Sequence, residues 1–392
     1  MTPGIRGGVA SPALVVLLGS DLAIWAAFYA LMPYLPERIM SLGYSGTLAG
    51  VILAVRLLSQ QGTMPVSGAV ADRWGYRRAL LTGLLLRTAG FALMATVTSA
   101  SLLVLTAVLS GAGGSLIGAA FKATYTEAPG GADLPTRFLW LTIADRLGQV
   151  AGPLLGEAAG AFPAKACLAA GLFLAVAAAV RLWLPEQQPT GAGPVWESVL
   201  AQVRDRRLAW LVVLLCGYWA IQQQMSVLIP LAAALLGAHP GVGMLFSLSA
   251  LTGLALLLFL PRLHTERLWQ RLLLAHGLTA GAMAIPAALP HYGGVVMATV
   301  VLAMAAVLGQ PAIDALVSTL APASGRGSTF GFAALSFGVG GALGQVAGGW
   351  AWTRWGEPAP WLPWLLFTAL GLLTLAGLQL LRKGVAADER DS

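Results

Sequence analysis

Long apolar runs, separated by short polar segments, are the feature that most limits how this chain of 392 residues can fold. A helix needs about 20 apolar residues to cross a bilayer, and dividing the sequence at Gly, Pro and charged clusters gives twelve such runs. Only 10% of the residues are charged, against about 25% in a soluble domain, and mean hydropathy is +0.78. We therefore expect an all-α membrane protein with 12 transmembrane helices and no removable leader.

The runs fall into two groups of six around a polar, Pro-containing segment. We expect an N-terminal six-helix bundle over residues 1–184, a cytoplasmic linker over 185–207 and a C-terminal six-helix bundle over 208–392. The expected helices are Ala13–Leu35, Thr47–Val70, Ala79–Val97, Leu102–Tyr125, Phe138–Ala159, Ala164–Leu184, Leu208–Leu236, Val242–Leu260, Leu268–Leu289, Gly293–Leu320, Thr329–Trp352 and Trp361–Leu381.

An internal repeat supports this division. LGQVAG occurs at Leu147–Gly152 and again at Leu343–Gly348, an offset of 196, which is half of 392. A weaker echo, offset by 194, pairs Asp72, Arg73, Arg77 and Gly83 with Glu266, Arg267, Arg271 and Gly277. Two pseudo-symmetric repeats running in the same direction are typical of one large class of transporters.

The basic residues predict the orientation of the chain. Of the 23 Lys and Arg, sixteen fall at or near one end of the apolar runs, three at the other end and four inside runs. Because cytoplasmic loops carry the excess of Lys and Arg, we expect both termini in the cytoplasm. The net charge of +7 then reflects membrane topology, and we expect lipid rather than nucleic acid as the partner.

The stretch GAVADRWGYRR joins two of the runs and contributes six candidate gating residues: Gly68, Asp72, Arg73, Gly75, Arg77 and Arg78. Glycines allow a tight turn and a close helix approach, and Asp72 is placed to cap the following helix. The arginines mark a cytoplasmic loop. An ordinary positive-inside loop remains the alternative.

A second motif, GQVAGPLLGEAAG, lies in the fifth run. Gly148, Gly152 and Gly156 recur every four residues and share one helix face, where a neighbouring backbone can pack closely. Pro153 removes one backbone hydrogen bond and bends the helix. A packing seam of small residues explains the glycines without any transport role.

Four charged residues inside apolar runs are candidates for proton coupling: Asp21, Arg56, Asp145 and Arg146. Asp145 shares the face of Gly148 and Gly152, and Asp21 lies a little before the middle of the first run. A carboxylate at that depth must be paired or protonated, which suits a proton carrier. Arg56 is the expected partner of Asp21, and a permanent structural ion pair is the alternative.

Amides and aromatic side chains could line a cavity for an amphipathic compound. The candidates are Trp25, Tyr29, Gln60, Gln61, Trp140, Tyr218, Gln222, Gln310 and Asp314. Helix packing and an aromatic belt at the membrane interface are the alternative. The sequence has no phosphate loop, metal-ligand cluster or nucleophile and base pair, so we expect no cofactor and a proton gradient as the energy source.

These motifs resemble the major facilitator superfamily, and within it the twelve-helix drug:proton antiporters of the bacterial MdtH-like multidrug-resistance branch. The resemblance rests on GAVADRWG, the helix 5 motif, VRLLSQQG (Val55–Gly62), LLRTAGF (Leu85–Phe91), LSGAGG (Leu109–Gly114) and GALGQVAGGW (Gly341–Trp350). It implies that the loop latches the two halves on the cytoplasmic side, that the helix 5 motif marks an antiporter, and that Asp21 and Asp145 are the family's acidic positions. Two departures are Glu157, where a second glycine is usual, and Ala107, where an arginine is usual, a role that Arg56 takes over in part.

We therefore expect a monomeric, proton-coupled secondary exporter of small amphipathic compounds, working by alternating access in the bacterial inner membrane. Export of one specific metabolite, such as a siderophore or peptide, is the alternative. A membrane-embedded enzyme is a remote one, since its His or Cys site would need partners that the four scattered histidines lack. Cys167 and Cys216 predict neither a disulfide nor a metal site.

Overall fold

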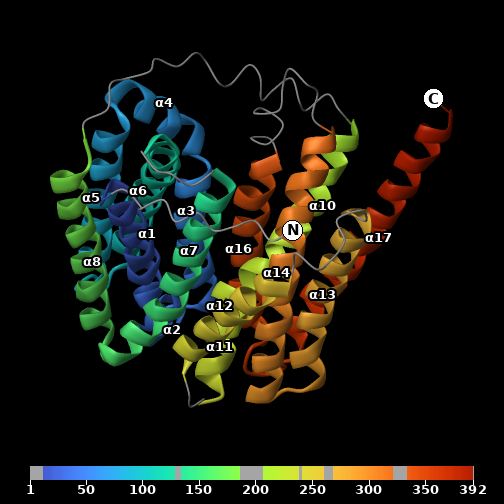
Figure 1. Cartoon of the computed structure of the whole chain (residues 1–392). Coiled ribbons are helices and arrows are strands. Elements are labelled where there is room, and N and C mark those ends of the chain that lie inside the picture. The colour runs from blue at the N-terminus through green and yellow to red at the C-terminus, as the bar shows by residue number, and fades with distance from the viewer. Residues whose placement is uncertain are drawn as a thin grey trace.

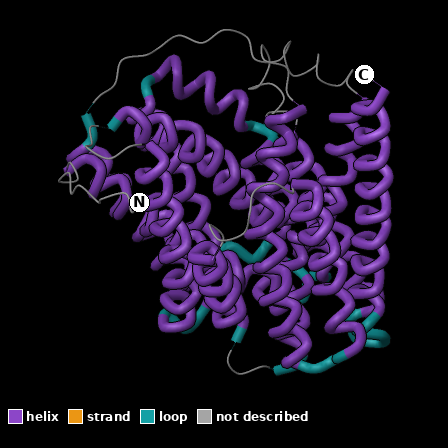
Figure 2. Tube along the Cα trace, turned by 45° about the vertical axis from the view of Figure 1, so that its right-hand side comes forward, coloured by secondary structure: helices purple, strands orange, loops and turns teal. Residues whose placement is uncertain are grey.

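The computed structural model describes residues 12–128, 134–185, 206–237, 241–259, 268–320 and 333–391. Every regular element in these ranges is helical (Figures 1 and 2). The expected linker and the acidic member of the weaker echo, Glu266, lie outside the described residues. The elements are α1 Pro12–Leu31, η1 Met32–Tyr34, α2 Leu35–Ser41, α3 Gly46–Gln61, α4 Met64–Trp74, α5 Tyr76–Met94, α6 Ala100–Glu127, α7 Leu134–Ala158, α8 Phe162–Trp183, α10 Arg206–Gln222, η2 Gln223–Ser226, α11 Leu228–Leu235, α12 Val242–Phe259, α13 Leu268–Ala288, α14 Tyr292–Leu320, η4 Ser336–Gly340, α16 Gly341–Trp355 and α17 Leu362–Asp391.

Three of the expected continuous helices are interrupted near a proline: the first at η1, the second between α3 and α4, and the seventh at η2. The second run breaks at Gly62 and Thr63 into α3 and α4, because Pro65 has no N–H to continue the ladder back to Gln61. The seventh run passes from α10 through the 3-10 turn η2 into α11, where Pro230 cannot donate to Ser226. The latter two breaks lie beside the cavities described below.

Seven helical spans in the described residues are long and apolar enough to cross a membrane: Pro12–Ser41, Ala100–Glu127, Phe162–Trp183, Leu208–Leu235, Leu268–Ala288, Tyr292–Val317 and Leu362–Lys383. The other expected spans fall short for visible reasons. The break at Gly62 shortens α3, whereas α5 contains three arginines and α7 contains Asp145, Arg146 and Gln149 in its middle. Polar groups inside membrane helices mark functional sites more often than loops do.

One close helix contact in the first half of the chain is the seam between α1 and α7. The three glycines of α7, Gly148, Gly152 and Gly156, lie against backbone atoms of α1. A Cβ atom on each would meet the carbonyl oxygen of Leu22, Ala26 and Ala30 in turn, at 2.6 Å for Gly152. No side chain fits there, so the period-four glycines build a packing seam.

The repeated LGQVAG plays the same part in the second half. Gly344 and Gly348, which are equivalent to Gly148 and Gly152, lie against Ala220 and Gln224 in α10 and η2. The leucines that begin the two copies, Leu147 and Leu343, both remain exposed on the outside of the protein. The sequence repeat therefore corresponds to a repeated helix contact.

Helices from the two halves of the sequence meet along two lines. In Figure 1 the helices up to α8 lie at the left and those from α10 onward lie at the right. Between them α3 packs on α16, where Gly50 and Gly349 bring the backbones together, and α7 packs on α12. The space between these contacts contains the cavities of the candidate site.

The seam predicts that alanine substitutions at two glycines change the stability of the protein differently. Gly152→Ala places a methyl group against the Ala26 carbonyl, and overpacking of this kind costs about 1–3 kcal/mol. Gly171→Ala in α8 meets nothing within 4 Å and gains helix propensity instead. Thermal unfolding of the purified protein in detergent should therefore show a lower melting temperature for Gly152→Ala and an unchanged or higher one for Gly171→Ala. Equal melting temperatures would contradict the seam.

Candidate functional site

The seam between α1 and α7 brings two acidic side chains together. Asp21 lies one residue before Leu22, and Asp145 lies three residues before Gly148, so both fall at the same level of the seam. Their carboxyl groups are within hydrogen-bonding distance of each other. Asp21 is 6% exposed, and its Oδ2 accepts no bond from any N–H or O–H donor in the described chain. Two ionised carboxylates at this distance would repel each other, whereas one proton between them would bridge the pair.

The acid pair faces a cavity of about 190 Å³, which we call the acid chamber. Lys122 of α6 lines this chamber and attracts Asp21 electrostatically. Gln60 and Arg87 form the wall on the other side. The chamber can therefore hold water and a proton next to the pair, close to three basic or amide side chains.

Arg56 is not the partner of Asp21. Its Nη1 donates to Gln60 Oε1 over 2.9 Å, and its guanidinium lies 5.0 Å from the centre of the Phe28 ring. Phe28 follows Asp21 by seven residues, which is about 10 Å along a helix. The expected pairing is wrong because the guanidinium of Arg56 lies beside Phe28, which is two turns of α1 beyond Asp21.

Arg87 of α5 is a site residue that the sequence did not single out. Its Nε donates to the carbonyl oxygen of Ser110 over 3.3 Å and its Nη2 to Gln60 Oε1 over 3.5 Å. Gly114 leaves room for the guanidinium, since a Cβ there would collide with it. In the sequence, the sign of such a role is that a charged residue lies inside an apolar run. Arg87 reaches Ser110 of α6, one turn beyond Ala107.

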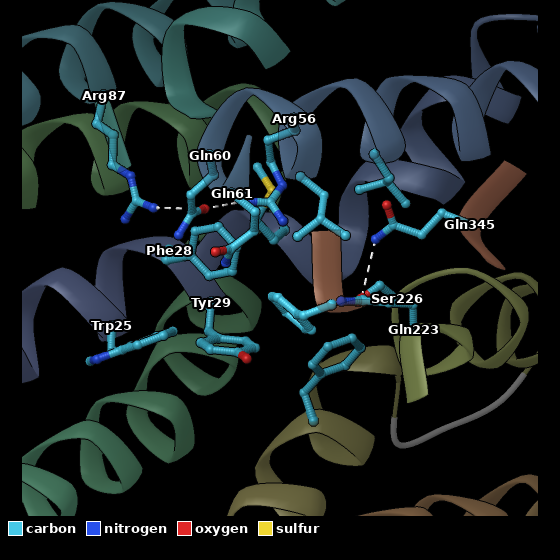
Figure 3. Close-up of a pocket in the computed structure, with 15 residues that line it drawn as sticks. Trp25, Phe28, Tyr29, Arg56, Gln60, Gln61, Arg87, Gln223, Ser226 and Gln345 are labelled. Carbon is cyan, nitrogen blue, oxygen red and sulfur yellow. Dashed lines mark hydrogen bonds between the residues drawn. The ribbon is translucent and has the colours of Figure 1, made fainter. Parts of the chain in front are cut away.

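The central cavity, about 240 Å³, lies between the halves of the sequence (Figure 3). Trp25, Tyr29, Gln60 and Gln61 line it as expected, together with Arg56 and Arg87. From the second half come Gln223, Ser226, Phe246, Phe337 and Gln345. Gln345 Nε2 donates to Gln223 Oε1 over 3.2 Å, and Trp25 stacks on Tyr29 with ring centres 6.0 Å apart.

A second cavity of about 230 Å³ shares Tyr29, Gln223 and Phe246 with the central one. It includes Gln222, as expected, and Arg146, whose Nη1 donates to Gln149 Oε1 over 3.0 Å. Consecutive helix residues point about 100° apart, so Arg146 faces this cavity while Asp145 faces the acid chamber. The two residues do not act at one place.

Four of the expected cavity residues lie elsewhere. Trp140 packs against the hydrophobic core. Tyr218 is fully buried and donates to the Ala305 carbonyl over 3.0 Å, while Gln310 and Asp314 are exposed on α14 and bond to each other over 2.9 Å. None of them lines the three cavities described above. The sequence identified their polarity and aromaticity, but not the direction in which they point.

The stretch GAVADRWGYRR was expected to be a loop, but it is helical except at Gly75: residues 68–74 end α4 and residues 76–78 begin α5. The hydrogen bonds of Asp72 and Arg77 stay within the first half of the chain. Gly75 has φ 87°, a backbone conformation that suits glycine. Asp72 accepts from the Tyr76 hydroxyl over 3.0 Å and does not cap α5, and Arg77 donates to the Arg181 carbonyl over 2.5 Å. Gly68 has open space around it, so no close helix approach requires it. Arg73 and Arg78 are exposed.

The end of the protein opposite this loop is held by contacts between the two halves. Thr47 at the start of α3 bonds Thr353 of α16 through its backbone N–H at 2.8 Å and its hydroxyl at 3.0 Å. Ser247 of α12 donates to the Val150 carbonyl over 2.9 Å. Within the first half, the Tyr34 hydroxyl donates to the carbonyl oxygen of Pro153 in α7 over 2.7 Å. The bonds of Thr47 with Thr353 and of Ser247 with Val150 therefore join the two halves of the chain.

Comparison with known proteins identifies the family. The pattern of the Major Facilitator Superfamily matches residues 17–345. The chain belongs to the Major Facilitator Superfamily. As a member of this superfamily it is a transporter and not an enzyme, and the candidate site is the interior of a multi-pass membrane protein.

Curated relatives within the superfamily are bacterial multidrug-resistance proteins. The chain is 31% identical over 370 residues to "Multidrug resistance protein MdtH" of Yersinia enterocolitica, with 92% of each chain covered. It is 32% identical to the protein of the same name in Yersinia pseudotuberculosis, again with 92% of each covered.

Solved transporter structures share the fold of this superfamily member. The nucleoside transporter NupG superposes with a TM-score of 0.79 at 15% identity, covering 95% of this chain and 99% of that one. The peptide transporter POT in complex with sulfate gives 0.79 at 18% identity, covering 99% and 96%. At this identity the likeness concerns the fold alone.

The described residues include two cysteines and a buried histidine. They contain no group of three His, Cys, Asp or Glu side chains placed to hold a metal ion. Cys167 and Cys216 are both free. His276 is buried against the carbonyl of Leu272.

The hydrogen bonds between Thr47 and Thr353 predict a cross-link. In a background with Cys167 and Cys216 replaced by Ser, Thr47→Cys with Thr353→Cys should form a disulfide under mild oxidation, because the Oγ1 atoms are 3.0 Å apart. The control is Thr63→Cys with Thr353→Cys, since Thr63 lies about 24 Å further along the chain direction of α3. Free thiols counted by mass spectrometry after maleimide labelling should be absent in the first pair and present in the second. Equal labelling of both pairs would contradict the closed end.

Proposed function

We propose that this transporter is a proton-coupled exporter of small amphipathic compounds, built from two six-helix bundles that alternate access to a site between them. The bundles comprise residues 1–184 and 208–392, joined by residues 185–207, and the twelve apolar runs cross the membrane. Both termini and the loop GAVADRWGYRR then lie in the cytoplasm, as the excess of basic residues at that end favours.

The observation that carries the proposal is the contact of Asp21 with Asp145 in a chamber beside the central cavity. A pair of carboxyls sharing one proton can take up a second proton or release the shared one, so its charge changes with the side to which it is exposed. Gln60 and Arg87 line both the chamber and the central cavity. A change of charge on the pair therefore acts directly on groups that also face the substrate.

The hydrogen bonds of the described chain fit an inward-facing state. The threonine contact closes the end opposite the basic loop, whereas the contacts of Asp72 and Arg77 stay within the first half of the chain. A compound can then enter from the cytoplasm and lie between the aromatic and amide side chains of the two halves. Protons from outside reset the carrier by reaching the acid pair in the opposite state.

The relatives favour export of drug-like compounds over a single metabolite. The two Yersinia proteins compared above are named for multidrug resistance, and the central cavity combines stacked aromatic rings with amides, which suits varied amphipathic molecules. A monomer suffices for this mechanism, since both halves of the site belong to one chain.

Asparagine at either acid should uncouple transport from the proton gradient. In proteoliposomes under a one-unit pH gradient, one exchanged proton supports about a tenfold accumulation ratio, because one pH unit corresponds to about 1.36 kcal/mol. Asp21→Asn and Asp145→Asn should each lower this ratio toward about one. Substrate exchange at equal pH should continue, since it needs no net proton movement.

Asp314→Asn is the matched control, because Asp314 is exposed and bonds only Gln310 among the described residues. It should accumulate substrate as the unaltered protein does. Full gradient-driven accumulation in both acid variants would exclude the acid pair as the coupling site. Transport of one metabolite that no dye displaces would favour the specific exporter instead.

A further inference from the structure

The geometry points to a site for a carboxylate of the substrate between Arg56 and Arg87, on the side of the central cavity formed by Gln60 (Figure 3). The inference rests on the proposed function, because it names the chemical class of the transported compound. The ligand is an amphipathic molecule with an aromatic body and one carboxylate.

The two arginines are buried cations without acidic partners. Arg56 is 8% exposed and Arg87 is 6% exposed. Within the described residues neither guanidinium has a carboxylate in ion-pair contact, and their bonds go to an amide and a backbone carbonyl. Buried charges are normally paired, so an arrangement of two such cations beside one cavity favours binding of an anion.

Their hydrogen-bond donors are largely unused. Each guanidinium has five N–H donors, yet Arg56 makes one bond, to Gln60, and its buried Nε makes none. Arg87 makes two, one of them to the same Gln60 oxygen at 3.5 Å. Both side chains thus converge on a single neutral oxygen. A carboxylate supplies two charged oxygens in the planar arrangement that guanidinium groups bind best.

The nearby acids do not neutralise this cluster. Asp21 and Asp145 lie in the adjoining chamber and contact each other, and Lys122 of the same chamber attracts Asp21. The hydrogen bonds of both guanidinium groups go to Gln60 and Ser110 instead. The positive charges of Arg56 and Arg87 have no acidic partner in the described chain, so a bound anion would neutralise them.

The opposite side of the cavity suits an apolar body. Figure 3 shows Trp25 and Tyr29 across the cavity from the guanidinium groups. Tyr29 also lies 6.0 Å from Phe246 of the second half. A flat ring placed against these side chains would contact both halves, while its carboxylate reached the arginines. Such a ligand would be a rigid molecule in contact with both halves at once.

The test compares a xanthene dye that carries a free carboxylate with the methyl ester of the same dye. Fluorescence anisotropy with the full-length protein in detergent measures both affinities without any gradient. Charge-assisted hydrogen bonds predict that the acid binds at least about tenfold more tightly than the ester. Arg56→Gln and Arg87→Gln should each reduce this preference to less than about threefold.

Lysine at either position keeps the charge and should retain part of the preference, which separates a role in binding from loss of folding. Arg354→Gln, an exposed arginine at the end of α16, should retain all of it. Equal affinity of acid and ester for the unaltered protein overturns the inference, and this comparison needs no variant. Stoichiometric binding of radioactive chloride that depends on both arginines, without any preference for the acid, would also overturn it.

The inference and the proposed function can fail separately. If the acid binds with the expected dependence on arginine but no pH gradient drives its transport, proton-coupled export is wrong and the carboxylate site stands. If a gradient drives transport of acid and ester alike by the unaltered protein, export stands and the carboxylate site is wrong.

Discussion

Backbone contact between α1 and α7 is the constraint on which the interior of this transporter depends. Three glycines allow the two helices to approach until no side chain fits between them. At that separation the carboxyl groups of Asp21 and Asp145 lie within hydrogen-bonding distance of each other. A larger residue in the seam would move α7 outward and separate the acids. The glycines thus support both the packing and the chemistry, and the two roles need not be treated as alternatives.

The three cavities share their walls. Gln60 and Arg87 separate the acid chamber from the central cavity, while Tyr29, Gln223 and Phe246 separate the central cavity from the second one. A side chain that faces two cavities responds to whatever occupies either of them. Proton binding and substrate binding can therefore influence each other through single residues, without a long pathway across the protein.

Much of this architecture could be predicted from the sequence. Apolar runs of sufficient length locate the helices, because the bilayer sets the length directly. Period-four glycines identify a seam, and Asp145 shares its face because helix geometry fixes which residues align. The partner helix of that face, α1, does not follow from spacing within α7.

The errors concern direction and depth. Arg56 was expected beside Asp21, but its guanidinium lies two helix turns away along α1. The expected helix ends are uncertain by a few residues, and this is enough to shift a residue by a turn or more along its neighbour. Tyr218 and Trp140 have the right chemistry for a cavity yet point into the core. Arg87 was visible only as a charge in an apolar run, because its role depends on Gly114 of a neighbouring helix.

Asp145 and Arg146 are neighbours in the sequence that face different cavities. Because both belong to one rigid helix, any rotation of α7 about its long axis swings the acid out of its compartment and the base out of its own in the same motion. A rotation of α7 would therefore change the charge in both compartments at once.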